Sequence, residues 1–140
     1  MFKNILLAFD GSDNSRKAAL VTGQLARQLQ PPAAVRITCA VHPIYGGLGE
    51  PNFTELASHR ALEGQDLLDV AVKLVGDGVE THTELLFGPA AEEIIKVAEV
   101  RECDLIVMGS RGLSALAGLV LGSHTQKVIS HAHCPVMVVR

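Results

Sequence analysis

Apolar residues of the kind that favour β-strands gather in five short runs along the chain. The runs cover residues 5–9, 35–41, 79–86, 105–108 and 136–139. Between them, apolar residues recur at the spacing of one helix face. These helical segments cover residues 15–30, 54–75, a stretch that begins near residue 89, and 123–130. Strands that alternate with helices in this way predict βαβ units and a parallel sheet.

Polar residues and prolines set the expected ends of these elements. Ser12 or Asp13 can cap the first helix and Thr54 the second, because their side-chain oxygens accept hydrogen bonds from exposed backbone amides. Pro89 suits the first turn of the third helix, where its missing N–H is not needed. In the strand at 79–86, polar residues alternate with apolar or small ones, which predicts an edge strand.

Two of the predicted strands are followed by residues suited to ligand binding. Asp10 follows the first strand, and a loop with several glycines follows the fourth. Ligands of open α/β sheets lie beyond the carboxyl ends of the strands, at the point where the winding reverses. The first and fourth strands are therefore predicted to be neighbours. The expected α/β fold is an open, doubly wound, Rossmann-like sheet of five parallel strands, in the order 3-2-1-4-5, with helices on both faces.

Composition narrows the classes of protein to consider. The 140 residues predict a single domain, 1–140, large enough for its own core. Aromatic residues make up only 4% of the chain, so Ala, Val, Leu and Ile must fill that core. A net charge of −3 offers no basic surface, so no nucleic-acid partner is expected. No apolar run approaches the roughly 18 residues of a membrane helix, so a soluble, cytoplasmic protein without membrane association is expected.

The cysteines and histidines raise the question of disulfides and metal sites. Cys39, Cys103 and Cys134 are scattered and form no CxxC pair, which favours reduced thiols. His131 and His133 stand close to Cys134, but no fourth ligand is evident in the sequence. A metal site is therefore not predicted.

The glycine-bearing loop after the fourth strand carries the strongest functional signal. It contains Gly109, Ser110, Arg111 and Gly112, then nine residues, then Gly122, Ser123, His124 and Thr125. Glycine lets a backbone approach an anion closely, and the first amides of a helix attract negative charge. Arg111 and the hydroxyls of Ser123 and Thr125 are donors suited to phosphate oxygens. The alternative is a glycine-rich turn in which Ser123 caps the following helix.

Asp10 and the segment 113–121 each have more than one interpretation. The Asp10 carboxylate could accept hydrogen bonds from a ribose or hold a hydrated metal ion, or it could satisfy the backbone of its own Asp-Gly turn. The segment begins at Leu113 and holds four leucines and a valine, which a solvent-exposed loop would not carry. It could pack over a nucleotide, join a subunit interface or complete the core.

The spacing of the glycines resembles a known signature. Gly109, Gly112, Gly122 and Ser123 match every fixed position of G-2x-G-9x-G-(S/T), the nucleotide-binding signature of the universal stress protein family. Residues 131–140 resemble the usual last strand of that family, and residues 4–15 resemble its first strand and turn. The resemblance runs from end to end and is weakest between residues 43 and 62. It implies the same strand order, in an adenine-nucleotide alpha hydrolase-like fold.

The resemblance also implies a ligand and the residues that bind it. The implied ligand is ATP with Mg²⁺. The implied binding residues are Ala8, Asp10, Val41, Gly109, Ser110, Arg111, Gly112, Leu113, Gly122, Ser123, His124 and Thr125. Asp10 would lie against the nucleoside, and the backbone of Val41 against adenine. Ala8 stands where many members have proline, and His124 where an apolar residue is common. The His124 ring would either add a pH-dependent donor near phosphate or point to solvent.

The sequence leaves three possible functions. A nucleotide-binding regulatory module with a stress-response role leads, ahead of a slow ATP hydrolase that acts as a timer and a ligand-free interaction scaffold. The sequence has no Walker-type phosphate loop and no obvious general base close to the glycine loop, so at most weak ATPase activity is expected.

The apolar strand Val136–Val139 lies at one end of the predicted order. Its unpaired edge predicts a homodimer formed by antiparallel pairing of two copies.

Overall fold

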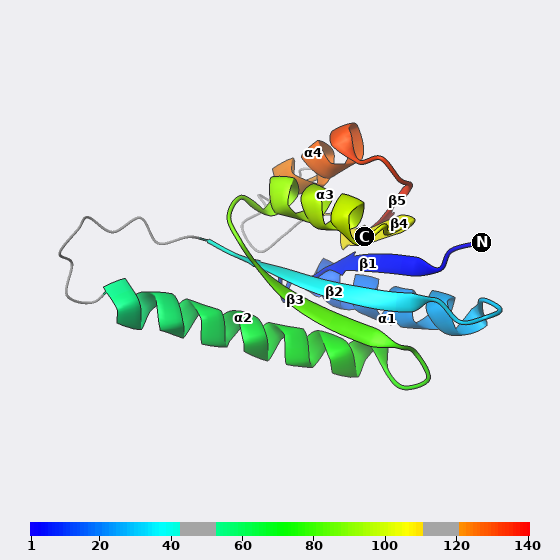
Figure 1. Ribbon diagram of the computed structural model, residues 1–140, viewed down its shortest axis with the longest axis horizontal. Coiled ribbons are helices and arrows are strands. Elements are labelled where there is room, and N and C mark those ends of the chain that lie inside the picture. Colours follow the sequence, from blue (N-terminus) through cyan, green and yellow to red (C-terminus); the bar gives the residue numbers. More distant parts are fainter. Residues whose placement is uncertain (43–52, 111–120) are drawn as a thin grey trace.

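The sheet contains five parallel strands in the order β3-β2-β1-β4-β5, as the sequence predicts (Figure 1). A computed structural model describes residues 1–42, 53–110 and 121–140 of the chain. The strands are β1 Asn4–Ala8, β2 Ala34–Val41, β3 Thr81–Phe87, β4 Leu105–Gly109 and β5 Val136–Val139. The helices are α1 Asp13–Gln28, α2 Phe53–Val75, α3 Ala90–Val100 and α4 Ser123–His131. Each strand lies within two residues of its predicted bounds.

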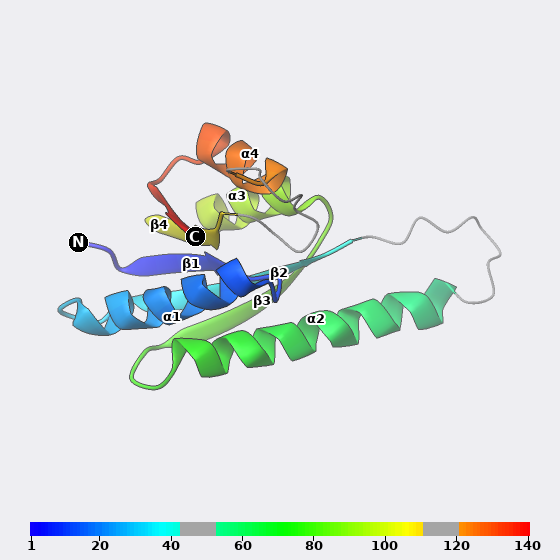
Figure 2. The same ribbon diagram turned by 180° about the vertical axis from the view of Figure 1, so that it is seen from behind.

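The helices cover both faces of the sheet in pairs. Figures 1 and 2 show α1 and α2 on one face and α3 and α4 on the other. Because neighbouring residues of a strand face opposite sides, each apolar strand contributes to two separate apolar clusters. Under α1 and α2 lie strand residues that include Ile5, Leu7, Val35, Ile37, Leu105 and Val107. Under α3 and α4 lie Leu6, Ile106 and Met108.

The helix starts partly follow the sequence prediction. Ser12 caps α1, since its hydroxyl accepts a hydrogen bond from the Ser15 N–H at 3.2 Å. The predicted cap at Thr54 is wrong, because α2 already begins at Phe53 and Thr54 lies inside its first turn. Pro89 occupies the cap position of α3, one residue before the helix, and makes no side-chain capping bond. A proline ring has no acceptor to offer there, so it limits the backbone conformation instead.

The two edges of the sheet differ in character. β3 is an edge strand, as its alternating polar residues predict. β5 is the other edge, and all four of its apolar residues are only partly buried. In the described part of the chain, no helix combines the length and the apolar character needed to cross a bilayer.

Candidate functional site

The carboxyl ends of β1 and β4 lie side by side at the centre of the sheet. β1 pairs with β2 on one side and with β4 on the other, where Ile5 stands opposite Leu105. The chain leaves β1 through α1 on one face and enters β4 from α3 on the other face, so the winding reverses between these strands. Asp10 and Ser110 follow the two strands. We call this region, where open α/β sheets bind ligands, the β1–β4 end.

Gly109 ends β4 because the first turn of α1 leaves no room for a side chain. A Cβ atom at this position would lie 2.8 Å from Asn14 Cβ, 2.9 Å from the Asn14 carbonyl carbon and 3.0 Å from the Ser15 nitrogen. Such distances are too short for ordinary Cβ contacts, and two of the three atoms belong to the backbone. The sequence predicts that the glycines of this loop let the backbone approach an anion. For Gly109 the structure supplies a packing reason, since it lets α1 begin directly beside β4.

Ser110 joins three elements at the β1–β4 end. Its N–H donates to the Val139 carbonyl oxygen of β5 at 2.8 Å, and its own carbonyl accepts from the Gly122 N–H at 2.7 Å. Its hydroxyl oxygen accepts a hydrogen bond from Asn14 Nδ2 of α1 at 3.1 Å. The residue is 4% exposed, so these bonds are formed away from bulk water. Ser110 therefore sets the position of α1, β5 and the start of α4 relative to one another.

Asp10 lies in a tight turn between β1 and α1. Its Oδ1 accepts a hydrogen bond from the Ser12 N–H at 2.9 Å, which is the local turn contact that the sequence offered as one interpretation. The Ser15 hydroxyl donates to the Ser12 carbonyl at 3.0 Å and accepts from the Asp10 N–H at 3.4 Å. The Asp10 side chain stays partly exposed at the β1–β4 end. The turn thus holds the carboxylate in place without burying it.

Helix α4 begins at the same end of the sheet. Gly122 is its cap residue, with an extended backbone (ψ 159°) and no side-chain capping bond. The alternative in which Ser123 caps this helix is therefore off by one residue. Ser123 and His124 form the exposed start of the helix. The first amides of a helix have no partner within it and carry its positive dipole end. An anion at this place would meet those amides directly.

The Thr125 hydroxyl has a different partner from the one the sequence suggested. Thr125 is 3% exposed, and its Oγ1 donates to the Gly109 carbonyl at 2.9 Å. A hydroxyl has a single proton to donate, so in this arrangement it is not available to a phosphate oxygen. Thr125 instead ties the first turn of α4 to the end of β4.

Val41 and Ala8 end the two strands β2 and β1. The Val41 side chain is 9% exposed and packs under α2, where a Cβ atom at Gly64 would lie 2.9 Å from Val41 Cγ2. The Val41 carbonyl accepts from the Gly88 N–H at 3.4 Å. Ala8 packs against the apolar cluster under α3 and α4. Both side chains are structural, so either residue would meet a ligand chiefly through its backbone.

Three of the predicted site residues, Arg111, Gly112 and Leu113, lie outside the described residues, as does most of the apolar segment 113–121. Sequence reasoning missed Asn14, which the structure places against both Gly109 and Ser110. The available signal was its position in the first turn of the helix that follows β1.

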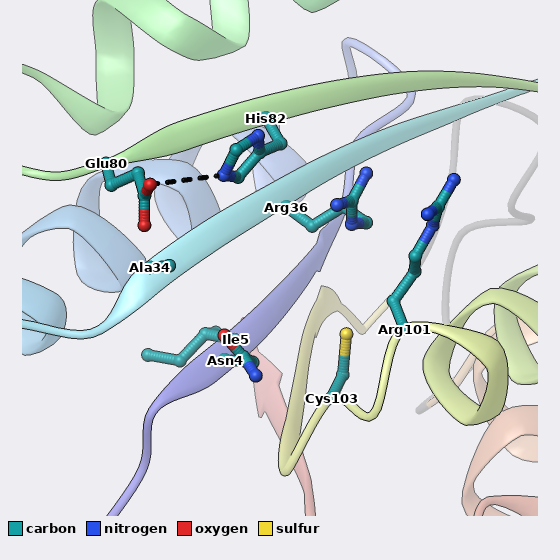
Figure 3. A pocket seen from close by; sticks show the side chains of 8 residues that line it. All are labelled: Asn4, Ile5, Ala34, Arg36, Glu80, His82, Arg101 and Cys103. Carbon is teal, nitrogen blue, oxygen red and sulfur yellow. Dashed lines mark ion pairs between the residues drawn. The ribbon is translucent and has the colours of Figure 1, made fainter.

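A second polar region lies at the opposite end of the sheet. A pocket of about 100 Å³ opens there, lined by Asn4, Ile5, Ala34, Arg36, Glu80, His82, Arg101 and Cys103 (Figure 3). Arg36 and Arg101 each donate to Glu84 Oε1 at 3.2 Å, and His82 lies 3.6 Å from Glu80. Two arginines and two glutamates balance in charge, so this pocket has little attraction for a phosphate. The phosphate-type chemistry is concentrated at the β1–β4 end.

The three cysteines are free thiols, as their spacing predicts. Burial raises the pKa of the Cys39 thiol to about 11, and the negative charge of Asp10 adds to this effect. Burial likewise raises the pKa of Cys103 to about 11 and that of Cys134 above its ordinary value of 9.0. All three are therefore protonated at neutral pH and poorly nucleophilic.

The histidines near the carboxyl terminus have neighbours other than a metal. His131 Nδ1 lies 3.0 Å from the Lys127 carbonyl, and His133 Nε2 lies 2.6 Å from Glu99 Oε1. Among residues 1–42, 53–110 and 121–140, no three His, Cys, Asp or Glu side chains come together as a metal site requires.

The fold and the β1–β4 end define a class of protein. It is a doubly wound α/β protein in which polar groups and the start of α4 meet where the winding reverses. The model of the Universal stress protein family matches residues 1–140, and the chain belongs to this family. The family and the fold predicted from the sequence are thus confirmed.

Individual relatives agree with this assignment. A universal stress protein of Thermus aquaticus is 42% identical over 140 residues, which cover both chains completely. The solved structure of the universal stress protein UspA from Lactobacillus plantarum has a TM-score of 0.88 at 28% identity, covering 99% of this chain and 98% of its own. A universal stress protein solved in complex with cAMP has a TM-score of 0.67 at 26% identity, covering 99% of this chain and 97% of its own.

Proposed function

We propose that this protein is a regulatory module of the stress response that binds an adenine nucleotide, ATP in the first place, at the β1–β4 end. The observation that carries the proposal is the meeting of the Asp10 carboxylate, the buried Ser110 hydroxyl and the amino end of α4. A nucleotide has a ribose with hydroxyl donors and a phosphate chain that only accepts, which matches these groups in kind. The structural neighbour in complex with cAMP supports the same class of ligand.

The phosphates would bind at the amino end of α4. Gly122 leaves the amides of the first turn without a side-chain cap, and a helix start of this kind favours phosphate oxygens. The exposed Ser123 hydroxyl and the backbone N–H of His124 would add further donors. Arg111, Gly112 and Leu113 would complete the phosphate site, as the glycine signature implies.

The nucleoside would lie across the ends of β1 and β2. The Asp10 carboxylate would accept hydrogen bonds from the ribose hydroxyls. Its hydrogen bond from the Ser12 N–H fixes the carboxylate before any ligand binds. Because the Val41 side chain is buried under α2, adenine would meet only the Val41 backbone. Together with bound phosphates, the Asp10 carboxylate would offer the oxygen ligands that Mg²⁺ prefers, since proteins usually hold this ion through one or two carboxylates and substrate phosphates.

Calorimetry and thermal unfolding with ATP and Mg²⁺ test this proposal. Ligand at one hundred times its dissociation constant should stabilise the fold by about 2.7 kcal/mol, which raises the melting temperature by several degrees. Gly122→Val should abolish both signals, because a branched side chain would block the approach to the helix start. Arg101→Gln, at the opposite end of the sheet, is the matched control and should bind as the wild type does. Absence of heat and of a melting shift in the wild type would refute nucleotide binding.

Self-association through β5 is the second part of the proposal. In the described structure β5 pairs with β4 on one side, and its four apolar residues stay partly exposed. An apolar edge strand presents unpaired backbone groups that another strand can pair with. Two copies joined by antiparallel β5 strands would satisfy these groups with two-fold symmetry. A homodimer is therefore expected.

A further inference from the structure

Asn14 is held in place from two directions at the β1–β4 end. It lies in the first turn of α1, and its backbone carbonyl carbon and Cβ crowd the position of Gly109. Its side-chain Nδ2 donates a hydrogen bond to Ser110 Oγ at 3.1 Å, and Ser110 lies 96 positions away in the sequence. The cap of α1 is already supplied by Ser12. The amide of Asn14 is thus engaged with the loop after β4 and not with the start of its own helix.

The contact from Asn14 restricts the Ser110 hydroxyl. A serine hydroxyl has one proton to donate and two lone pairs that accept. Asn14 Nδ2 can only donate, so it occupies a lone pair of Ser110 Oγ, and the O–H bond must turn away from it. The backbone N–H and C=O of Ser110 are also committed, to Val139 and Gly122. Among the hydrogen bonds within the described part of the chain, none uses the hydroxyl proton of this buried residue, and that proton is directed away from Asn14.

The neighbourhood of that donor is the start of α4. The Gly122 N–H bonds to the Ser110 carbonyl, which places the cap of α4 directly beside Ser110. A phosphate oxygen at the helix start would therefore lie near an oriented hydroxyl as well as near free amides. Hydrogen bonds from a donor to an anion are stronger than those between neutral groups.

We propose that Asn14 is a positioning residue for nucleotide binding, which orients the Ser110 hydroxyl so that its proton is presented to a phosphate oxygen. The inference rests on the proposed function, and it assigns a role to a residue outside the glycine signature. It predicts an acceptor group of the ligand at this place, since the proton of the Ser110 hydroxyl needs an acceptor. Loss of the orienting amide should weaken phosphate binding while leaving the fold intact.

The variant Asn14→Asp separates this role from simple packing. A carboxylate has the shape of the amide but can only accept hydrogen bonds. The Ser110 hydroxyl would therefore donate its hydrogen bond to the new carboxylate and no longer to the ligand. A negative charge in the first turn of α1 favours the helix dipole, so the melting temperature of the ligand-free protein should stay the same or rise. The affinity for ATP should nevertheless fall by at least about tenfold. Gln24→Glu makes the same chemical change on an exposed site of α1 and should leave the affinity unchanged.

A double-mutant cycle completes the test. Asn14→Ala and Ser110→Ala should each weaken binding, but Asn14→Ala should have no further effect once the hydroxyl is gone. Both ATP and inorganic triphosphate are titrated by calorimetry. Binding of triphosphate but not ATP, with the same dependence on Asn14, would retain this inference and refute the nucleoside part of the proposed function. Wild-type affinity in Asn14→Asp, or additive effects in the cycle, would overturn the inference alone. No binding of either probe to the wild type would overturn both.

Discussion

Replacing Gly23 by alanine should destabilise the protein although alanine favours helices. Gly23 is a buried residue in the middle of α1, at the place where that helix meets the end of α2. An added Cβ would lie 2.9 Å from the Val75 carbonyl carbon, 3.1 Å from its Cα and closer still to its oxygen. The same oxygen accepts a hydrogen bond from Arg27 Nη1 at 2.6 Å. Backbone atoms cannot rotate aside, so α1 and α2 must separate.

The expected size of the effect follows from three terms. Alanine gains about 1 kcal/mol over glycine in a helix. Overpacking a tight interface costs about 1–3 kcal/mol, and loss of the charged hydrogen bond from Arg27 costs about 1.5–3 kcal/mol. The net loss is therefore about 1.5–5 kcal/mol. For a chain of this length that corresponds to a fall in melting temperature of roughly 10 °C.

Gly64→Ala in α2 is the matched control. A Cβ atom there would lie 2.5 Å from Leu85 Cδ1 and 2.9 Å from Val41 Cγ2, which are side-chain methyl groups. These contacts are with side chains and not with backbone, and Leu85 can change its rotamer, so Gly64→Ala should lose less stability than Gly23→Ala. Both variants are measured by thermal and urea unfolding with circular dichroism. Steric conflict at Gly23 is refuted if Gly23→Ala has the same melting temperature as the wild type, or if Gly64→Ala loses as much stability as Gly23→Ala does.

Two further predictions concern the thiols and the edge strand. The free energy of unfolding should fall as the pH rises from about 9 to about 11, because folded Cys39 and Cys103 retain protons that the unfolded chain releases in that range. Urea unfolding across this range measures the fall, which should be smaller in Cys39→Ala; an equal fall in that variant would contradict the assignment. Light scattering should give a dimer mass for the wild type and for Ile129→Lys, which adds the same charge on exposed α4, but a monomer mass or aggregates for Val138→Lys in β5. A monomeric wild type at micromolar concentration would exclude the β5 dimer.

The strand order was predictable because chemistry and topology point to the same place. Asp10 and the glycine loop follow different strands, yet ligands of such sheets bind where the winding reverses, so these two strands had to be neighbours. The strands themselves are apolar runs whose residues fill both clusters, a pattern visible in the sequence. The ends of helices were harder to predict, as Thr54 shows, because several nearby residues can accept a hydrogen bond from the same backbone amide.

The roles of individual site residues were harder to predict, because they depend on contacts between distant segments. Thr125 has the donor chemistry for phosphate, yet its proton goes to the Gly109 carbonyl. Gly109 was expected to serve an anion, whereas its lack of a side chain makes room for Asn14. The contact of Asn14 with Ser110 spans 96 positions, and no local pattern in either segment reveals it.

The central strand draws its two neighbours from very different parts of the chain, and this has a consequence for folding kinetics. The Asn4 N–H bonds to Asp104 across 100 residues, whereas β2 follows β1 after a single helix. Contacts between such distant residues carry a larger loop-closure cost and slow the folding of a chain. The β1–β4 end is complete only after that long loop has closed. A ligand held there should therefore slow unfolding far more than it speeds folding, so that occupancy would lengthen the lifetime of the folded protein.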